Sequence, residues 1–272
     1  MPALNPALRA SLKPPHLTEA SYHSRAARRF WLSSSDIKAA HRCEAAWLAD
    51  YLGKAPRPKS DAFDFGHLFE AALTMTRGEL DRYLTEHPEL LSTRGASKGQ
   101  LKAEYATALD MATAVRRSPY LRGVIKRSAK QVILTGSVCG VPVRVMMDLL
   151  DKDGSIYDIK STRDFKPLYD AAREEWMEWW AYWYYPMQLY VYREIARQNG
   201  IDVPRVGLIA ASKSDCDVQA ITFGEDVLAA AKADTEYTLT RIKAIADGEE
   251  PDECGCCKYC ISHKKIDSFK EI

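Results

Sequence analysis

The strongest constraint on the fold is a change of hydrophobic period at residue 131. Three strand-like runs follow one another there, QVILTGSV, VPVRVMMDLL and SIYDIKST, separated only by Cys139-Gly140 and by Asp151 to Gly154. Connections this short join antiparallel neighbours. Residues 131–160 therefore predict an antiparallel meander, which any fold of this chain must accommodate.

Helical periodicity marks three segments before the meander and two after it: residues 32–53, 61–75, 97–119, 166–198 and 224–249. Ser34 or Ser35 is the expected N-cap of the first helix, and Gly53 its expected end. The fourth helix is expected to be interrupted at Pro186, because proline removes a backbone donor from the helix interior.

Two further strands are expected at residues 203–213 and 217–223. A crossover helix between the meander and these strands would place a later strand parallel to the meander's last one. The order helix, three strands, helix, strand therefore predicts an α/β fold with a mixed central sheet.

The chain is expected to have three parts. Residues 1–30 carry four prolines and no apolar period, which favours an irregular arm. Residues 31–250 hold the periodic segments and form the main domain. Residues 251–272 form a tail rich in cysteine.

Composition limits which partners and which cellular location are expected for the protein. The formal net charge is +1 and 46% of the residues are hydrophobic, so any nucleic-acid surface must be a local patch. No run approaches the roughly 20 apolar residues of a membrane span. The first residues also lack the layout of a secretory signal. A cytoplasmic protein without membrane contact is expected.

Acidic residues converge in the predicted meander. Its hairpin brings Asp158 near Asp148, and Asp158 shares one face of its strand with Lys160. Neighbouring carboxylates repel unless a cation neutralises them, and hard oxygen ligands favour Mg²⁺ or Mn²⁺. Glu70, on the helix over 61–75, is a third candidate ligand, and His67 is a weaker one. Taken singly, each residue is as readily a solvated surface group.

The candidate residues occur in one order along residues 31–250: Gly66-x-x-x-Glu70, Asp148, Asp158-Ile159-Lys160 and Gln188-x-x-x-Tyr192. This ordered set resembles the motifs of PD-(D/E)XK nucleases, in particular the exodeoxyribonuclease VIII (RecE) group and its lambda exonuclease relatives. The resemblance implies a restriction-endonuclease-like core, αβββαβ, whose mixed central sheet is flanked by helices.

The resemblance also implies a metal site. Glu70, Asp148, Asp158 and the backbone carbonyl of Ile159 would hold one or two Mg²⁺ or Mn²⁺ ions. RecB-like members have histidine four positions after the glycine, where this chain has glutamate, as in lambda-type exonucleases. His67 is therefore expected to line the site or to pack.

Three further residues receive roles from the resemblance. Lys160 would orient or deprotonate the attacking water, and Gln188, supported by Tyr192, would position the DNA end or the lysine. The implied activity is a metal-dependent exonuclease acting on linear double-stranded DNA, 5′ to 3′, in phage-type recombination with a single-strand annealing protein. The implied assembly is a ring-shaped homo-oligomer.

Two composition runs have two interpretations each. Residues 116–130 carry six arginines and lysines, which either contact phosphates or form a solvated face. Residues 176–185 hold seven aromatic side chains, which suit a core or subunit interface better than stacking on unpaired bases. We expect the interface.

Four cysteines have the spacing of a metal site. Cys254, Cys257 and Cys260 follow C-x-x-C-x-x-C, and Cys43 lies on the first expected helix, ahead of the candidate catalytic residues. Some RecB-like nucleases use such a set to hold a [4Fe-4S] cluster, and four thiolates also suit Zn²⁺. An idle reduced tail is the third possibility.

Two alternative functions follow. One is an iron–sulfur RecB-like nuclease of the helicase-associated or CRISPR-adaptation type. The other is a catalytically inactive module that binds DNA ends, although the presence of Glu70, Asp148, Asp158 and Lys160 argues against it.

Overall fold

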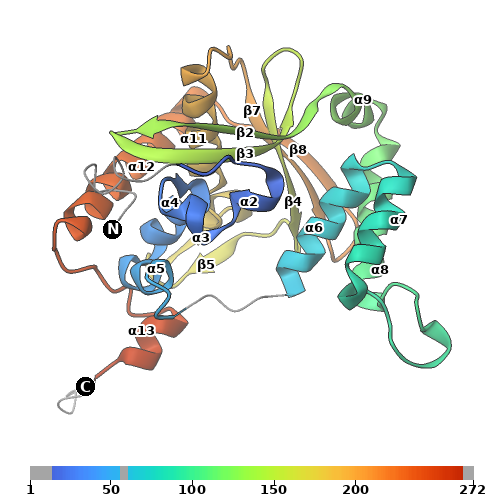
Figure 1. Cartoon of the computed structure of the whole chain (residues 1–272), viewed down its shortest axis with the longest axis horizontal. Coiled ribbons are helices and arrows are strands. Elements are labelled where there is room, and N and C mark those ends of the chain that lie inside the picture. The colour runs from blue at the N-terminus through green and yellow to red at the C-terminus, as the bar shows by residue number, and fades with distance from the viewer. Residues whose placement is uncertain (1–13, 56–60, 266–272) are drawn as a thin grey trace.

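A mixed β-sheet with helices on both faces forms the centre of the molecule (Figure 1). The computed structural model describes residues 14–55 and 61–265. The strand order is β1-β3-β4-β7-β8, with β2 also paired to β3. The strands are β1 (Leu32–Ser33), β2 (Ala129–Val138), β3 (Val141–Leu150), β4 (Ile156–Thr162), β7 (Val206–Ser212) and β8 (Val218–Thr222).

The predicted meander and crossover are both present. β2, β3 and β4 pair antiparallel in sequence, whereas β7 lies parallel to β4 and antiparallel to β8. The parallel pair follows from the helix between β4 and β7, α11 (Tyr185–Gln198), which returns the chain to the same end of the sheet. The expected α/β fold with a mixed central sheet flanked by helices is confirmed.

Each face of the sheet buries its own core. On one face Trp47, Met147 and Leu189 belong to a core that includes α4 (Ser34–Arg42), α5 (Glu44–Tyr51), α11 and α12 (Glu225–Ala246). On the other face the core includes Phe69 and Met111 from α6 (Asp61–Thr74) and α8 (Ala103–Arg117), with α9 (Pro119–Arg127) beside them. Leu80, Tyr83 and Leu84 of α7 (Arg77–Glu86) also pack against this core.

The helix expected over residues 32–53 is two helices. The chain is extended at Cys43, with φ −165° and ψ 108°, so α4 ends there and α5 begins. The expected cap at Ser34 or Ser35 is also wrong by one or two positions. Ser33 caps α4 because the Asp36 carboxylate, three residues later, accepts a hydrogen bond from the Ser33 backbone and completes a capping box.

The expected long helix over residues 166–198 is wrong in its first half. β5 (Leu168–Asp170) and β6 (Glu175–Met177) form a separate antiparallel hairpin, followed by α10 (Trp179–Tyr182). Pro186 lies in the first turn of α11, where a missing backbone donor costs nothing, so it starts a helix instead of interrupting one.

The ends of the chain pack onto the domain. α2 (Glu19–Tyr22) and α3 (Arg25–Arg28) lie within the expected irregular arm, and buried Tyr22 exchanges hydrogen bonds with Arg144 of β3. Residues 1–13 of that arm lie outside the described residues. α13 (Lys258–His263) packs against α5. Within residues 14–55 and 61–265, none of the helices has the length and apolar content that a membrane span requires.

Candidate active site

The site begins where two strands of the meander separate. β3 and β4 are paired at Leu149–Tyr157 and Leu150–Ile156. At the next position a side chain takes the place of a backbone hydrogen-bond partner. Oδ2 of the buried Asp148 accepts a hydrogen bond from the backbone N–H of Ile159 at 2.8 Å. This bond fixes the Asp148 carboxylate beside the strand that carries Asp158 and Lys160.

The third carboxylate of the site belongs to Glu70. Glu70 lies on α6, and the amide nitrogen of Gln131 donates to both Glu70 Oε1 and Asp148 Oδ1, the latter at 3.4 Å. Gln131 has φ +50°, a left-handed conformation that costs energy in a strand. The amide therefore joins two acids that would otherwise repel each other.

Asp158 and Lys160 project from the same face of β4, as alternation predicts. They form an ion pair, and the Asp158 side chain is only 1% exposed. The other oxygen of Asp158 accepts from Gln188 Nε2 at 2.8 Å, and the same amide contacts the Tyr192 hydroxyl at 3.0 Å. α11 thus presents its glutamine and tyrosine to the acid, one helical turn apart.

A second lysine reaches the same cluster from α4. Lys38 Nζ donates to Gln188 Oε1 at 2.5 Å and lies 5.0 Å from the centre of the Tyr185 ring. The Lys160 ammonium lies 5.4 Å from the same ring. The side chains of Lys160, Lys38 and Tyr185 therefore lie together beside Asp158 and its partner Gln188.

Burial and mutual repulsion destabilise the charged forms of these carboxylates, and a bound cation would stabilise them. Burial, together with the charge of Asp158, raises the pKa of Glu70 to about 7 although Lys160 opposes the shift. Burial and the charges of Asp158 and Glu70 hold the pKa of Asp148 well above its usual range. A divalent ion among these oxygens would replace the protons.

The pKa values of Lys160 and Lys38 shift in opposite directions. Burial disfavours the charged form of Lys160, but the carboxylates of Asp158 and Asp148 outweigh burial and raise the lysine pKa. Burial and the charge of Lys160 lower the pKa of Lys38 to about 7. Lys160 is therefore a fixed positive charge at neutral pH.

The structure brings together most of the residues that the sequence singled out, with one exception. His67 lies on α6 with its ring centre 4.0 Å from that of Phe63. Among the described residues, no hydrogen bond connects His67 with Glu70, Asp148 or Asp158. The packing role expected of His67 suits this position.

Sequence reasoning missed Gln131, Lys38 and Tyr185. For Gln131 a signal exists, because a hairpin centred on Cys139-Gly140 places residue 131 opposite residue 148. For Lys38 and Tyr185 there is none, since their contacts depend on how α4 and α11 pack over the sheet.

The metal-free protein should lose stability as the pH rises. Glu70 titrates near pH 7 in the folded protein but near its ordinary value of 4.5 when unfolded, so the folded state binds more protons between these values. We expect the free energy of unfolding to fall by roughly 3 kcal/mol across this window and to recover at pH 8 when Mg²⁺ is added. Thermal unfolding at pH 5.5, 7 and 8 measures both effects.

Glu70→Gln is the control for this titration, and we expect it to flatten the profile. A melting temperature of wild type that stays constant or rises from pH 5.5 to 8 without metal would contradict the assignment.

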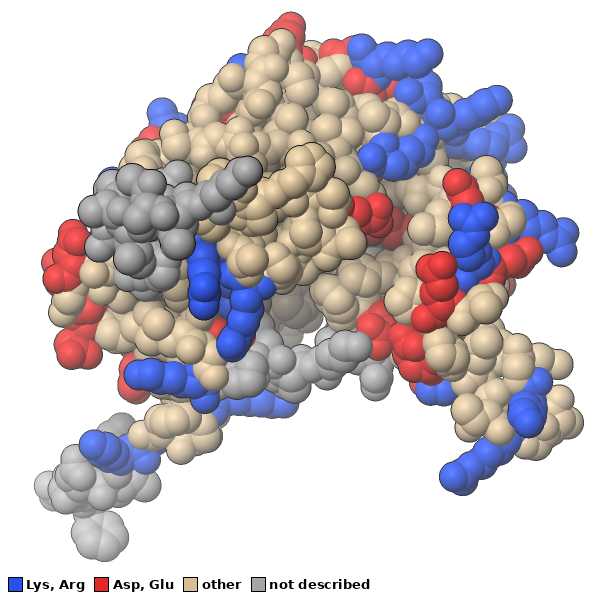
Figure 2. Space-filling view, viewed as in Figure 1, with Lys and Arg blue, Asp and Glu red and all other residues tan. Residues whose placement is uncertain are grey.

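A cationic pocket lies one helical turn from Glu70. It has a volume of about 300 Å³ and is bordered by Leu73 and Thr74 of α6 and by basic side chains at Arg116, Arg122, Lys126 and Lys130. In the space-filling view, lysine and arginine side chains gather over the region of α9, at the upper right (Figure 2). Part of the basic run is committed elsewhere, since Arg127 pairs with Asp151.

The aromatic run divides between core and surface. Trp179 is 1% exposed and packs in the core, whereas Trp183 and Trp176 are 43% and 72% exposed. The expected subunit interface stays a prediction.

Four cysteines from the two ends of the domain converge. The Sγ atoms of Cys43, Cys254, Cys257 and Cys260 lie within 4.8 Å of one another. Burial alone would raise the pKa of Cys254, but the backbone N–H groups of Cys256 and Cys257 lower it to about 7. A thiolate is the form that binds a metal, so the residues present fit a metal site.

Comparison with known proteins identifies the family of the chain. Residues 33–263 match the family model of a PDDEXK-like domain of unknown function. No curated protein matches.

Solved structures also match the chain. A protein from Eubacterium rectale described as a "Putative exonuclease" is 25% identical with a TM-score of 0.79, over 94% of this chain and 97% of that chain. SSO0001 is 15% identical over 76% of this chain and 84% of that chain, with a TM-score of 0.30, too low to bear on the fold. The chain thus belongs to the family of PDDEXK-like domains and is a member of the PD-(D/E)XK nuclease superfamily.

Proposed function

We propose that this protein is a metal-dependent deoxyribonuclease that removes nucleotides from the ends of linear double-stranded DNA. One observation carries the proposal: Glu70, Asp148 and Asp158 converge from three elements beside Lys160, in a member of a nuclease superfamily. The similarity to the protein described as a "Putative exonuclease" supports action at DNA ends.

The donor set suits Mg²⁺ or Mn²⁺. Glu70, Asp148 and Asp158 supply carboxylate oxygens and Ile159 a backbone carbonyl, all hard ligands. The Gln131 amide nitrogen donates to two of these acids, Glu70 and Asp148. A positive charge between the two carboxylates would be favourable. When bound, one or two such ions would polarise a phosphate and lower the pKa of a water.

Side chains of the protein would position the reacting groups and stabilise the developing charge. Charged Lys160 would hold the attacking water against the phosphate and stabilise the negative charge that develops there. Gln188 holds Asp158 through one end of its amide and Lys38 through the other, which fixes both on the same side of the site. Tyr192 supports the glutamine at 3.0 Å.

The finer features of the proposal rest on the ordered motifs. They support an exonuclease of the RecE and lambda type that proceeds 5′ to 3′ and serves phage-type recombination in the cytoplasm. A single-strand annealing protein would take the exposed strand. The exposed Trp176 suits the subunit contact of a homo-oligomer.

For the cysteine site we propose one structural Zn²⁺. Four thiolates at about 2.3 Å from one tetrahedral ion lie roughly 3.8 Å apart. The Sγ separations are 3.5 Å for Cys43–Cys260 and Cys257–Cys260, 3.8 Å for Cys43–Cys257 and 3.9 Å for Cys254–Cys260. A [4Fe-4S] cluster binds each thiolate through a different iron and separates the sulfurs further. This spacing favours zinc over the iron–sulfur alternative.

End-labelled linear duplex DNA tests the main proposal. With Mg²⁺ or Mn²⁺ we expect release of labelled nucleotides, and with EDTA none. Comparing 5′ and 3′ labels reports the direction, and a circular duplex is the control for end dependence. Binding to DNA ends without hydrolysis under any metal would favour the inactive module instead.

The cationic pocket beside Glu70 should contribute to DNA affinity. Lys126→Glu reverses one charge there, so we expect duplex binding to weaken about tenfold and the slope of log K against log salt to fall by about 1. Lys232→Glu, an exposed lysine on α12, is the matched control. Equal effects of the two variants would show that the pocket does not contact DNA.

A further inference from the structure

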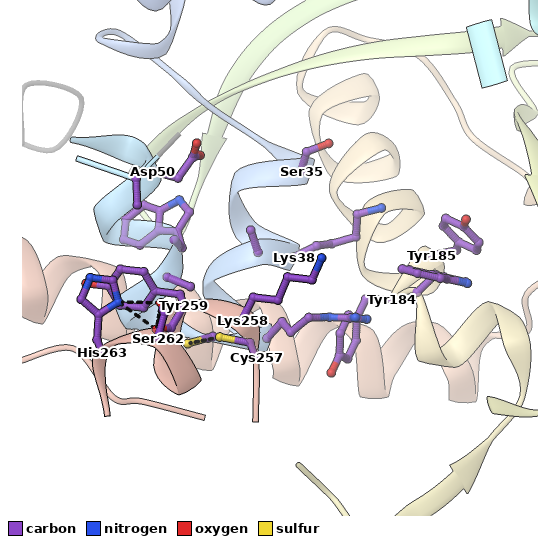
Figure 3. A pocket seen from close by; sticks show the side chains of 17 residues that line it. Ser35, Lys38, Asp50, Tyr184, Tyr185, Cys257, Lys258, Tyr259, Ser262 and His263 are labelled. Atoms are coloured by element: carbon purple, nitrogen blue, oxygen red, sulfur yellow. Dashed lines mark hydrogen bonds between the residues drawn. The ribbon is translucent and has the colours of Figure 1, made fainter. Parts of the chain in front are cut away.

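A larger cavity is bordered by Lys38 and Tyr185, two residues that contact the candidate active site. It has a volume of about 670 Å³ and lies between α4, α5, the start of α11 and α13. Figure 3 shows its lining side chains, which come from segments far apart in the sequence. Cavities of this size hold nucleotide-sized groups in proteins.

The lining combines positive charge with aromatic rings. Lys38 and Lys258 extend from different elements toward the same open space (Figure 3). Arg42 also lines the cavity, with its guanidinium carbon 5.2 Å from the ring centres of both Trp183 and Tyr184.

The acid of the lining does not cancel this charge. Asp50 forms an ion pair with Arg28 at 2.8 Å. The cavity therefore favours an anionic occupant.

The cavity adjoins the catalytic cluster, because two of its lining residues, Lys38 and Tyr185, contact that cluster. Tyr185 lines it, and the ring centre of this tyrosine lies 5.0 Å from Lys38 Nζ and 5.4 Å from Lys160 Nζ. Lys38 also contacts Gln188, which holds Asp158. A strand whose phosphate lies at Asp158 can thus extend past Tyr185 into the cavity.

We propose that this cavity binds unpaired nucleotides of the DNA strand, next to the phosphate that is cut. The inference rests on the proposed nuclease function and specifies its substrate as strand ends with unpaired bases. The half-exposed Trp183 provides a stacking surface, and Lys38 and Lys258 meet the phosphates.

The chemistry of the lining favours single strands over duplex. Aromatic faces joined to a cationic groove bind single strands, because only unpaired bases can stack on a side chain. In a duplex the base faces are stacked on one another and only phosphates and base edges are exposed, so the aromatic lining has no face to stack on.

Binding of a fluorescent oligo(dT) of eight nucleotides tests the proposal, with Ca²⁺ in place of Mg²⁺. We expect Trp183→Ala and Lys258→Glu each to weaken binding about tenfold, and Lys258→Glu to lower the salt slope by about 0.7. Lys264→Glu, six residues further along the chain and outside the lining, is the matched control. Photocrosslinking of a bromodeoxyuridine oligonucleotide should mark the peptide containing residues 183–185.

The outcomes separate this inference from the proposed function. If Lys258→Glu, Trp183→Ala and Lys264→Glu all bind the oligonucleotide as wild type does, the cavity assignment is overturned, even if wild type degrades DNA. If binding depends on the cavity but wild type hydrolyses no DNA with Mg²⁺ or Mn²⁺, the nuclease function fails and the binding site stands.

Discussion

Asp158→Asn should reduce Mg²⁺-dependent hydrolysis of linear duplex DNA by at least about 10³-fold. This residue contacts Lys160 through one oxygen and Gln188 through the other, and it is a candidate metal ligand. Asparagine keeps the shape and removes the charge. The metal should therefore bind more weakly, which calorimetric titration with Mn²⁺ measures directly.

The control is Asp153→Asn in the same hairpin. Asp153 pairs with Arg205 at 2.9 Å at the surface, so its loss should leave the hydrolysis rate near that of wild type. If Asp158→Asn binds Mn²⁺ and cuts DNA as wild type does, the metal site lies elsewhere.

Lys160→Ala distinguishes binding of metal from action on water. We expect hydrolysis to fall about 10²- to 10³-fold while Mn²⁺ still binds, because this variant removes a charge but no metal ligand. Loss of Mn²⁺ binding in Lys160→Ala would instead assign the lysine a role in holding Asp158.

The sequence predicted the strands better than the connections around them. Period-two alternation and two short turns were sufficient for β2, β3 and β4, because register and face follow from local pattern. Residues 166–178 were predicted to be helical, but they contain the paired strands β5 and β6. Their aromatic residues suit either state, and tertiary packing decides between them.

The interruption between α4 and α5 at Cys43 is a second feature that the sequence did not predict. Periodicity runs through residues 34–51 without a helix breaker, yet the chain is extended at this cysteine. Its side chain turns toward Cys257 and Cys260, so the local conformation follows from a contact with the other end of the chain. Such a long-range cause is absent from any sequence window.

The candidate site follows the same division. Glu70, Asp148, Asp158 and Lys160 were available as ordered motifs, because their chemistry requires those residue types. The groups that hold them, Gln131 and Lys38, act through contacts between elements and carry no motif.

Removing the cysteine metal should have the second large effect. Cys257→Ser replaces one thiolate of the four, so we expect bound zinc to fall from about one per chain to near zero and the melting temperature to fall by about 10 °C. Metal analysis and thermal unfolding measure these outcomes. Cys256→Ser is the control, since Cys256 is exposed and outside the group of four, and it should unfold within about 1 °C of wild type.

If the purified protein contains iron and absorbs broadly near about 400 nm, the four cysteines hold an iron–sulfur cluster and not zinc. Unchanged metal content and stability in Cys257→Ser would contradict a metal site altogether.

The same variant should also slow DNA hydrolysis, because the cysteine site and the active site share a helix. Cys43 terminates α4, and Lys38 lies five residues earlier, about 7.5 Å along the helix axis. A second link joins the chain ends nearby: Arg241 binds Glu44, and the Asp252 backbone N–H donates to the same carboxylate at 2.9 Å. Loss of the metal would leave this link intact, so the fold should persist while the position of Lys38 against Gln188 loosens. A melting temperature that falls without any change in the hydrolysis rate would show that the cysteine site stabilises the domain but does not position α4.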